Sequence, residues 1–277
     1  MDLVFSDIHA DISALDTIIS LTTSSQFTKK YGEFSRVINL GDLLERGTNP
    51  KEVLEKMKEL SENYKMISIM GNHDESIVYG KNLDGISLES IAMHRSLKEK
   101  ELEFFTKNKD GTFGIQEEID KKQGLVCVHG GPLDPKKILP ENPQNEWLYQ
   151  KTWQRLSDEE EFFSHYGYHY SATSAFSETK TKTKNPIILC GHQHMEAALS
   201  YNNDKVQEIL SETKVQTEKL GDYTIEKKEI PIEPDTSYLV RLGLGGPSGY
   251  YGTGEAIPHF GIIQNDQKKI ILFGIYS

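Results

Sequence analysis

The sequence predicts an α/β fold in a single domain, and two patterns of hydrophobic residues carry this prediction. In the first half of the chain, short apolar runs alternate with stretches whose apolar residues recur at helical spacing. Strand–helix–strand units of this kind form right-handed crossovers and a mainly parallel sheet. From about residue 205 the chain becomes rich in β-strand signals. We therefore expect one domain over residues 1–277, with a second sheet beside the parallel one.

Three short apolar runs in the first half predict buried strands, at residues 3–5, 36–40 and 66–70. After the first run, apolar residues at helical spacing predict a helix that contains Ile12, Leu15, Ile18 and Ile19. After the second run, Asn49 is a suitable N-cap and Pro50 suits a first helical turn. The apolar face of the helix that they begin consists of Val53, Leu54, Met57 and Leu60.

The elements in the rest of the chain are less regular. Residues from about 86 to 107 look helical but lack a clean apolar stripe, and residues 125–128 and 187–190 are again short buried strands. Between these two strands lies an aromatic and polar region in which we expect no strand. That region ends in a loop exposed to solvent at residues 177–186. A last strand is expected at 269–273.

Composition argues against several classes of protein. The net charge is −11 and no block of lysine and arginine stands out, unlike a protein that wraps nucleic acid. No stretch approaches the roughly 20 apolar residues of a membrane span, and the N-terminus lacks the basic region of a signal peptide. The two cysteines, Cys127 and Cys190, indicate a reducing compartment, and we expect a cytoplasmic protein. Each follows an apolar run, which favours a buried apolar role over a thiolate ligand or nucleophile.

Polar residues cluster directly after five of the apolar runs. The segments are Ser6-Asp7-Ile8-His9, Gly41-Asp42-Leu43-Leu44-Glu45-Arg46-Gly47, Gly71-Asn72-His73-Asp74-Glu75, His129-Gly130-Gly131 and Gly191-His192-Gln193-His194. In an open α/β sheet, groups at the carboxyl ends of the strands converge on one crevice. We therefore expect the five segments to meet and to gather seven side chains, namely Asp7, His9, Asp42, Asn72, His129, His192 and His194.

These seven side chains have the character of a metal site. Carboxylate oxygen, amide oxygen and imidazole nitrogen suit ions such as manganese, iron or zinc, and the absence of thiolates argues against a structural zinc. A single Asp-x-His or His-x-His motif is more often structural than metal-binding. Five polar segments that each follow a predicted strand indicate a metal site instead. Seven ligands exceed what one ion takes from a protein. We therefore expect two ions that share a bridging carboxylate.

The motifs resemble, in the same order, the five motif blocks of the calcineurin-like metallophosphoesterase superfamily. The matching blocks are Asp7-x-His9, Gly41-Asp42, Gly71-Asn72-His73-Asp74, His129-Gly130 and Gly191-His192-x-His194. Residues 1–75, 124–135 and 186–196 carry this resemblance, and residues 238–247 carry it more weakly. It implies a β-sandwich of two mixed sheets flanked by helices, with four layers in the order α/β/β/α. It also implies a dinuclear phosphoesterase.

The resemblance assigns the ligands to two ions bridged by Asp42. One ion would be held by Asp7, His9 and His194, and the other by Asn72, His129 and His192. The pair of ions would generate a hydroxide for in-line attack on phosphorus. His73 would protonate the leaving oxygen or contact the phosphate, and Asp74 would fix the tautomer and orientation of His73.

The resemblance extends to two branches of the superfamily. Glu45-Arg46-Gly47 after Gly41-Asp42 is similar to the serine/threonine protein phosphatases and the symmetric dinucleoside-tetraphosphate hydrolases, in which the arginine binds phosphate oxygens. His192-Gln193-His194 is similar to the small phosphodiesterases, because the protein phosphatases lack the second histidine. We expect a phosphodiesterase-like enzyme in which Arg46 favours small phosphorylated substrates such as nucleotides or dinucleoside polyphosphates. A surface salt bridge is the alternative role for Arg46.

Other functions remain open. A protein phosphatase or a phosphomonoesterase would fit the same motifs, and a DNA nuclease is disfavoured by the acidic charge. A non-catalytic scaffold is disfavoured because every ligand position is filled. The unmatched segments, about 76–123 and 136–185, are expected to shape the substrate pocket. The aromatic residues 162–170 could stack a nucleobase, although an ordinary packed loop is the favoured interpretation. We expect His94 and His259 to be structural.

Overall fold

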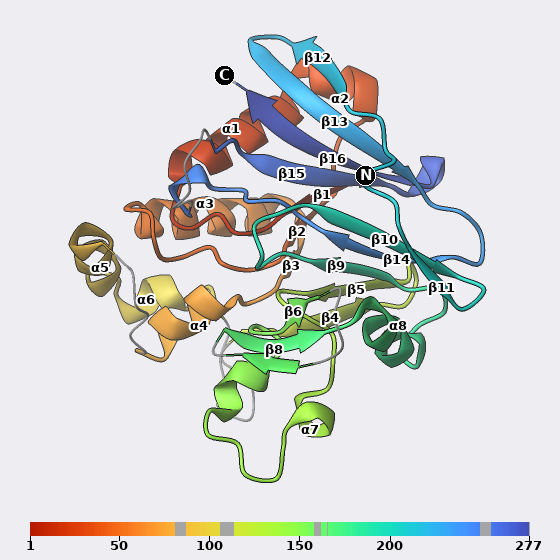
Figure 1. Ribbon diagram of the computed structural model, residues 1–277. Coiled ribbons are helices and arrows are strands. Elements are labelled where there is room, and N and C mark those ends of the chain that lie inside the picture. Colours follow the sequence, from red (N-terminus) through yellow and green to blue (C-terminus); the bar gives the residue numbers. More distant parts are fainter. Residues whose placement is uncertain (81–86, 106–113, 158–161, 165, 250–255, 277) are drawn as a thin grey trace.

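The computed structural model describes residues 1–80, 87–105, 114–157, 162–164, 166–249 and 256–276. Two large mixed sheets form the centre of the molecule, and helices flank them (Figure 1). The sheets enclose one hydrophobic core between them, and each has a further core on its outer face. This is the α/β/β/α sandwich that the resemblance implies.

The first sheet has the strand order β12-β13-β16-β15-β1-β2-β3. Its strands are β1 (Asp2–Phe5), β2 (Arg36–Asn39), β3 (Lys65–Ser68), β12 (Gln216–Leu220), β13 (Tyr223–Pro231), β15 (His259–Gln264) and β16 (Lys269–Tyr276). Strands β1, β2 and β3 are parallel, and the other pairs are antiparallel. The parallel prediction is therefore confirmed for three strands, and the β-rich tail completes the sheet.

The second sheet has the order β11-β10-β14-β9-β5-β4. Its strands are β4 (Glu117–Asp120), β5 (Leu125–Val128), β9 (Ile187–Cys190), β10 (Ala197–Asn202), β11 (Lys205–Glu208) and β14 (Ser237–Arg241). Strands β5, β9 and β14 run parallel, with antiparallel strands on both sides. The two predicted buried strands of this half, β5 and β9, thus lie side by side in its middle.

Most of the helices begin where the sequence supplies a side-chain cap or a proline. The long ones are α1 (Ile12–Thr23) and α3 (Pro50–Asn63), and the shorter ones are α2 (Ser25–Tyr31), α4 (Asn72–Val78), α5 (Leu88–Arg95), α6 (Glu99–Leu102), α7 (Pro135–Ile138) and α8 (Ala172–Lys180). The Asp11 carboxylate caps α1 by accepting a 3.0 Å hydrogen bond from the Ala14 N–H. Asn49 is the N-cap residue of α3 as predicted, although its side chain makes no capping hydrogen bond.

Alternate residues of the central strands face different cores, as the two-residue period of a strand requires. Leu3 and Phe5 of β1 pack with the helices on the outer face, whereas Val4 points between the sheets. Leu125 and Cys127 of β5 likewise enter the core between the sheets. Strands buried on both faces explain why the predicted runs are continuously apolar.

A third, small sheet packs on the outer face of the second one, and the sequence prediction missed it. It has the order β6-β8-β7, with β6 (Arg155–Leu156), β7 (Phe162–Ser164) and β8 (Gly167–Tyr170). Tyr170 of β8 is fully buried in the core beneath β5 and β9. The prediction of no strand in this region was wrong because strands of two to four residues are too short to show a period.

Two further predictions need correction at their boundaries. Helix α8 occupies the start of the stretch 177–186 that was expected to be an exposed loop, because the Ser171 hydroxyl caps the helix by accepting from the Ser174 N–H. The expected helix at 86–107 is split into α5 and α6. Residues 86, 106 and 107, and His165 of the aromatic segment, lie outside the described residues.

Both cysteines are buried at strand ends and form no disulfide. Burial raises the pKa of the Cys127 thiol to about 12 and that of the Cys190 thiol to about 12. Both side chains are therefore neutral thiols near neutral pH, which agrees with the apolar role expected for them. In the part of the chain that the structure describes, no helix has the length and hydropathy to cross a bilayer.

Candidate metal centre

The seven predicted ligands follow the carboxyl ends of five strands. Asp7 and His9 come after β1, Asp42 after β2 and Asn72 after β3. In the second sheet, the loop after β5 carries His129, and the loop after β9 carries His192 and His194. Because strands β1, β2 and β3 are parallel, and so are β5 and β9, each set of loops emerges at one edge of its sheet.

Hydrogen bonds join the loops of the two sheets. The His192 N–H donates to Oδ2 of Asp7 over 3.0 Å. His129 Nδ1 lies 2.8 Å from the carbonyl oxygen of Leu40, which precedes Asp42. Since backbone carbonyls only accept, Nδ1 of His129 carries the proton and Nε2 is left to face the other ligands. The loops of the two sheets are thus bonded to each other at this point, and they carry the ligands.

The acidic and histidine ligands form two groups that share one carboxylate. One group contains Asp7, His9, Asp42 and His194, and the other contains Asp42, His129 and His192. Within each group, one potential ligand atom per residue lies within 4.8 Å of all the others. Asp42 is the residue common to both. This is the arrangement that two ions with a bridging carboxylate require.

Asn72 completes the second group with a neutral oxygen. Its Oδ1 atom lies 2.8 Å from Nδ1 of His192 and 3.0 Å from Nε2 of His129. Six of the seven ligands are buried, and His194 has a side chain that is 20 % exposed. All seven predicted ligands are therefore brought together, and the group is open to solvent on the side of His194.

Several buried polar atoms of these ligands have no hydrogen-bond partner among the residues that the structure describes. Such atoms are Oδ1 of Asp7, Oδ2 of Asp42 and Nε2 of His192. A buried polar atom without a partner is costly, and most such atoms in folded proteins are paired. The three atoms belong to the residues predicted to bind metal, one of them the shared carboxylate. Their donor chemistry and orientation therefore fit a metal centre.

The charges in the site favour a cation beside Asp42. Burial alone would raise the pKa of Asp42, but the charges of His129 and His73 outweigh burial and hold this pKa well below its ordinary value. Burial opposes a charged His129, yet the Asp42 carboxylate prevails and raises the pKa of His129 to about 9. The buried carboxylate thus attracts positive charge to its immediate surroundings, as a cation site must.

The loops that carry the ligands have an unusual backbone conformation. Among the described residues, thirteen that are not glycine have positive φ, and eight of them lie in these loops. They are Asp7, His9, Ala10, Asp42, Glu45, Arg46, His192 and His194. The left-handed region is unfavourable for residues with a Cβ atom, although Asp and His tolerate it better than most. Tertiary contacts must therefore hold the loops in place.

Gly71 shows how tightly the loops pack. A Cβ atom at this position would lie 2.0 Å from Oδ1 of Asp42. That same oxygen accepts a 2.9 Å hydrogen bond from the His73 N–H. The glycine before Asn72 is therefore required for the close approach of two loops, rather than for a turn.

The environment of His73 differs from the prediction in one respect. Asp74 was expected to orient His73, but the Asp74 carboxylate instead accepts backbone N–H bonds from Asp42, Leu44 and Gly71, each 2.9 Å long. Burial raises the pKa of Asp74 to about 7. Nδ1 of His73 is instead paired with a carboxylate oxygen of Glu45. The assignment of Asp74 as the orienting residue was wrong, because α4 directs its side chain back to the loop after β2.

Arg46 lies on the other side of the same imidazole. Its Nη2 atom is 3.2 Å from Nε2 of His73. The His73 side chain is 13 % exposed, so this pair lies at the solvent side of the ligand group. Arg46 therefore lies next to the candidate ligand group, through its contact with His73.

Sequence reasoning missed Arg155 of β6. Burial lowers the pKa of His192, and the positive charge of Arg155 lowers it further. Asp42 and Asp7 also act on Arg155. The Nε–H of Arg155 donates to the carbonyl oxygen of Tyr166 over 3.0 Å. A second arginine thus lies close enough for its charge to act on the ligands, and no local sequence signal predicted it because β6 lies in the unmatched segment.

The two remaining histidines of interest make structural contacts. His94 is buried on α5, and its Nε2 atom accepts a 2.7 Å bond from the Glu45 N–H. His259 lies 2.9 Å from a carboxylate oxygen of Glu196 through Nδ1. Neither residue belongs to the two ligand groups. His94 nevertheless supports the loop that presents Glu45 and Arg46.

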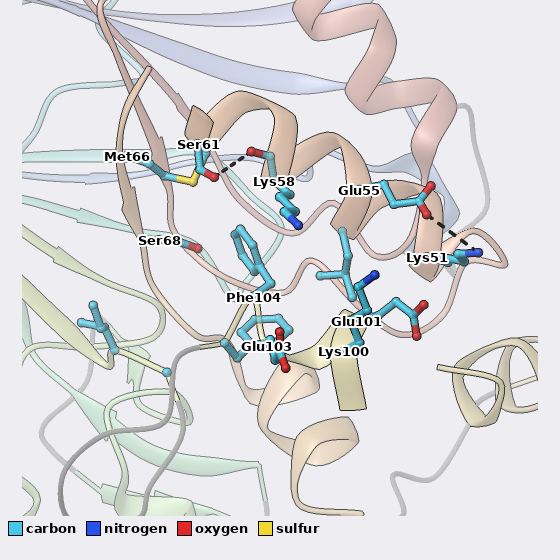
Figure 2. Close-up of a pocket in the computed structure, with 14 residues that line it drawn as sticks. Lys51, Glu55, Lys58, Ser61, Met66, Ser68, Lys100, Glu101, Glu103 and Phe104 are labelled. Carbon is cyan, nitrogen blue, oxygen red and sulfur yellow. Dashed lines mark hydrogen bonds and ion pairs between the residues drawn. The ribbon is translucent and has the colours of Figure 1, made fainter. Parts of the chain in front are cut away.

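A cavity of about 720 Å³ lies elsewhere, between α3, β3, α6 and residues 114–115 (Figure 2). Lys58, Lys100 and Phe104 are among the residues that line it. None of the predicted metal ligands or catalytic residues does so. The cavity therefore adds nothing to the chemistry of the ligand group.

Comparison with known protein families and curated sequences gives two matches. A family model described as calcineurin-like phosphoesterase matches residues 3–196. An uncharacterized protein of Methanocaldococcus jannaschii is 26 % identical over 140 residues, which cover 49 % of this chain and 51 % of that protein. The chain thus spans about half the length of the curated relative it matches.

Solved structures show the same fold at low identity. A metallophosphoesterase from Sphaerobacter thermophilus has a TM-score of 0.58 and 18 % identity, with 100 % of this chain and 87 % of that chain covered. A hypothetical protein from Pyrococcus horikoshii has a TM-score of 0.55 and 15 % identity, covering 98 % and 87 %. A protein serine/threonine phosphatase from Saccharomyces cerevisiae has a TM-score of 0.52 and 14 % identity, covering 100 % and 80 %.

Proposed function

The chain belongs to the calcineurin-like phosphoesterase family, and from this premise we propose that it hydrolyses phosphate esters with two metal ions bridged by Asp42. The observation that carries the proposal is the geometry of this carboxylate. Asp42 is common to both ligand groups and is fully buried, and its Oδ2 atom has no hydrogen-bond partner in the described part of the chain. Asp7, His9 and His194 would hold one ion, and Asn72, His129 and His192 the other. Manganese, iron and zinc suit this set of donors.

The chain's own residues hold the proposed ligands in place. When bound, two ions of this kind activate water and neutralise charge on the phosphate. Asp7 is kept in place by the strand that it follows and by the bond from the His192 N–H, and Asp42 by its own strand and the bond from the His73 N–H. The Nδ1–H bond of His129 to Leu40 fixes the tautomer that leaves Nε2 free for a ligand role. The reacting phosphate would enter from the side of His73 and His194, which is exposed.

His73 is the proposed proton donor to the leaving oxygen. It lies at the solvent side of the ligand group, and the Glu45 carboxylate holds its Nδ1. A carboxylate on Nδ1 orients the ring and directs Nε2 toward the side from which the substrate would enter. Asp74 supports this arrangement indirectly, because it ties Gly71 to the loop after β2.

Arg46 and Arg155 would bind the phosphate oxygens that do not react. A guanidinium presents several N–H donors in a plane and matches a phosphate group better than a lysine does. Two arginines near the ligands suit substrates with more than one negative charge. We therefore propose phosphodiesters, nucleotides or dinucleoside polyphosphates as substrates, with the segments about 76–123 and 136–185 shaping the pocket. Two neutral, unpaired thiols fit action in the cytoplasm.

A phosphomonoesterase or protein phosphatase is the second candidate. The observation that favours it is the cluster of His73, Glu45 and Arg46, since an arginine beside the proton donor suits a terminal phosphate with two charges. A non-catalytic scaffold has less support, because every ligand and the proposed proton donor are present and gathered.

A panel of substrates with Mn²⁺ tests the proposal and ranks the candidates. The panel contains p-nitrophenyl phosphate, bis-p-nitrophenyl phosphate, ATP and diadenosine tetraphosphate, and kcat/KM is measured for each. We expect hydrolysis that is lost on chelation and restored by metal, with the highest kcat/KM for a diester or polyphosphate. Arg46→Ala should lower kcat/KM for ATP and diadenosine tetraphosphate more than for bis-p-nitrophenyl phosphate, which has no further phosphate group. If the metal-loaded protein hydrolyses none of these esters, the proposal is wrong.

A further inference from the structure

The small sheet β6-β8-β7 is attached directly to the metal centre. Gln193, which lies between His192 and His194, accepts a 2.8 Å hydrogen bond from the Leu156 N–H and donates to the Leu156 carbonyl over 3.1 Å. Arg241 of β14 fixes the same Gln193 by donating to its Oε1 over 2.6 Å. Strand β6 is therefore held against the loop of two metal ligands, and β8 and β7 follow in order away from it.

One row of side chains crosses this sheet, with one residue from each strand. Arg155 of β6 is in register with His169 of β8, and His169 is in register with Phe162 of β7. Residues in register lie on the same face of a sheet. The row therefore begins at Arg155, whose neighbour Leu156 is bonded to the loop of two metal ligands, and ends at an aromatic ring.

The opposite face of the small sheet packs on the body of the protein. Leu156, Tyr168 and Tyr170 belong to the core beneath β5 and β9. Phe163 is in register with Tyr168 and stacks on Tyr149, with ring centroids 4.7 Å apart and planes 9° apart. The face with Phe162 is thus the one that is turned away from that core.

The far end of the row is a stacked pair of rings with an exposed surface. The rings of Phe162 and His169 have centroids 4.3 Å apart and planes 21° apart. Ser164 holds His169 through a 3.0 Å hydrogen bond to Nε2. The Phe162 side chain is 39 % exposed. Flat, exposed aromatic pairs of this kind bind other planar rings by stacking.

The dimensions of the row select among phosphate esters. Adjacent strands lie about 4.8 Å apart, so β7 lies roughly 10 Å from β6 across the sheet. An aryl ester carries its ring directly on the ester oxygen, so its ring stays next to the phosphate. In a nucleotide, the sugar separates the phosphate from the base and places the base farther along the row.

Resting on the proposed function, we propose that the Phe162–His169 pair binds the nucleobase of a nucleotide substrate while Arg155 binds its phosphate. The substrate class is then a nucleoside phosphate or polyphosphate, rather than a phosphoprotein or a simple aryl phosphate. Phe162 acts as a specificity residue that contacts the part of the substrate that does not react. The aromatic segment 162–170 thus contributes through one exposed face, while its other face is the packed structure that the sequence favoured.

A matched pair of variants tests this assignment. Phe162→Ala removes the platform, and Phe163→Ala removes a ring of similar exposure, 41 %, from the other face of the same strand. With Mn²⁺, we expect Phe162→Ala to raise KM for ATP by on the order of tenfold, whereas Phe163→Ala leaves it within about twofold. Neither should change kcat/KM for p-nitrophenyl phosphate. Phe162→Trp should restore the KM for ATP, because it restores a stacking surface.

Binding of AMP to the metal-loaded protein, measured by calorimetry, separates this proposal from the proposed function. We expect Phe162→Ala to weaken AMP binding by on the order of tenfold and to leave binding of inorganic phosphate unchanged. Equal effects of the two alanine variants, or a loss for p-nitrophenyl phosphate as large as that for ATP, would overturn the nucleobase site. If the protein hydrolyses no ester at all, the proposed function fails, and the comparison of AMP with phosphate still decides whether Phe162 binds a base.

Discussion

The five ligand loops and the small sheet β6-β8-β7 meet at Gln193 and are built on different principles. Each ligand loop continues a strand of the main sandwich and holds side chains that are almost wholly buried, and three of the five loops include residues of left-handed conformation. The small sheet has strands of two to four residues, and its outer face carries an exposed ring. The first region depends on the whole fold, whereas the second depends on a few local contacts.

This difference teaches how chemistry and selectivity are separated in the chain. A shift in a ligand loop disturbs the core strand behind it, so the geometry of the centre is tied to the stability of the sandwich. A change in the small sheet is limited by the contacts of Gln193 and the core around Tyr170. We therefore expect substitutions in the loops to abolish turnover and substitutions in the small sheet to change substrate preference.

The largest effect is expected for Asp42→Asn. The variant keeps the shape of the shared ligand but removes its charge, so both ions lose their common anionic donor. Loss of several kcal/mol of transition-state stabilisation corresponds to a fall in kcat/KM of at least about a thousandfold. Bound metal measured by elemental analysis should fall together with activity. A variant with full metal content and near-normal turnover would show that Asp42 does not bridge.

Gly71→Ala should break the same region without removing a ligand. The added Cβ would collide with Oδ1 of Asp42 at 2.0 Å and displace one of the two loops. A displacement of about 1 Å in a catalytic group can lower turnover by about a hundredfold, and we expect an effect of that size in kcat. Metal titration followed by steady-state kinetics measures it. Unchanged kcat would mean that the ligand loops tolerate a displacement without loss of turnover. The loops would then not differ from the small sheet in this respect.

A comparison of Glu45→Gln with Asp74→Asn sharpens the roles inside the loops. Glu45 contacts the His73 ring, so its loss should lower kcat by about tenfold to a hundredfold with little change in KM. Asp74 contacts three backbone N–H groups, so Asp74→Asn should mainly lower the free energy of unfolding. Kinetics and denaturant unfolding on both variants separate the two outcomes. A reversed pattern would return the orienting role to Asp74.

The smallest effect is expected for Gln193→Leu, which loosens the small sheet and leaves the ligands in place. Leu156 would lose two hydrogen bonds to the side chain, each worth about 1 kcal/mol. We expect KM for a nucleotide substrate to rise about threefold to tenfold while kcat stays within about twofold. Metal content should not change. A large fall in kcat would show that the small sheet and the ligand loops form one unit after all.

The fold and the ligands could be predicted because each ligand stands next to a strand in the sequence. Val37 and Ile38 predict β2, and Asp42 follows within a few residues. The position of Asp42 in the sequence therefore predicts its position at the end of the strand. The same reasoning failed for Asp74, since adjacency to His73 in the chain suggested a contact that the first turn of α4 prevents. A helix directs neighbouring side chains about 100° apart, which follows from its 3.6 residues per turn.

The small sheet could not be predicted for a different reason. Its placement depends on pairs such as Gln193 with Leu156, 37 residues apart, and on the burial of Tyr170 beneath β5 and β9. Neither contact produces a pattern that can be recognised within a short stretch of sequence. Arg155 was missed with it, because an arginine in an irregular segment is most often a solvated charge. Its position became evident only once Leu156 was placed beside the metal ligands.

The left-handed residues of the ligand loops also determine whether this site can be transferred to another protein. Eight non-glycine residues hold an unfavourable φ at the ends of the strands, each at an expense of about 1 kcal/mol. A short peptide copied from any of these segments would relax to ordinary backbone angles and turn its ligands apart. Transplanting the five motifs into another scaffold would therefore fail unless the recipient also supplied the parallel strands and the cross-sheet bonds. The centre belongs to the sandwich as a whole and cannot be moved as a set of sequence fragments.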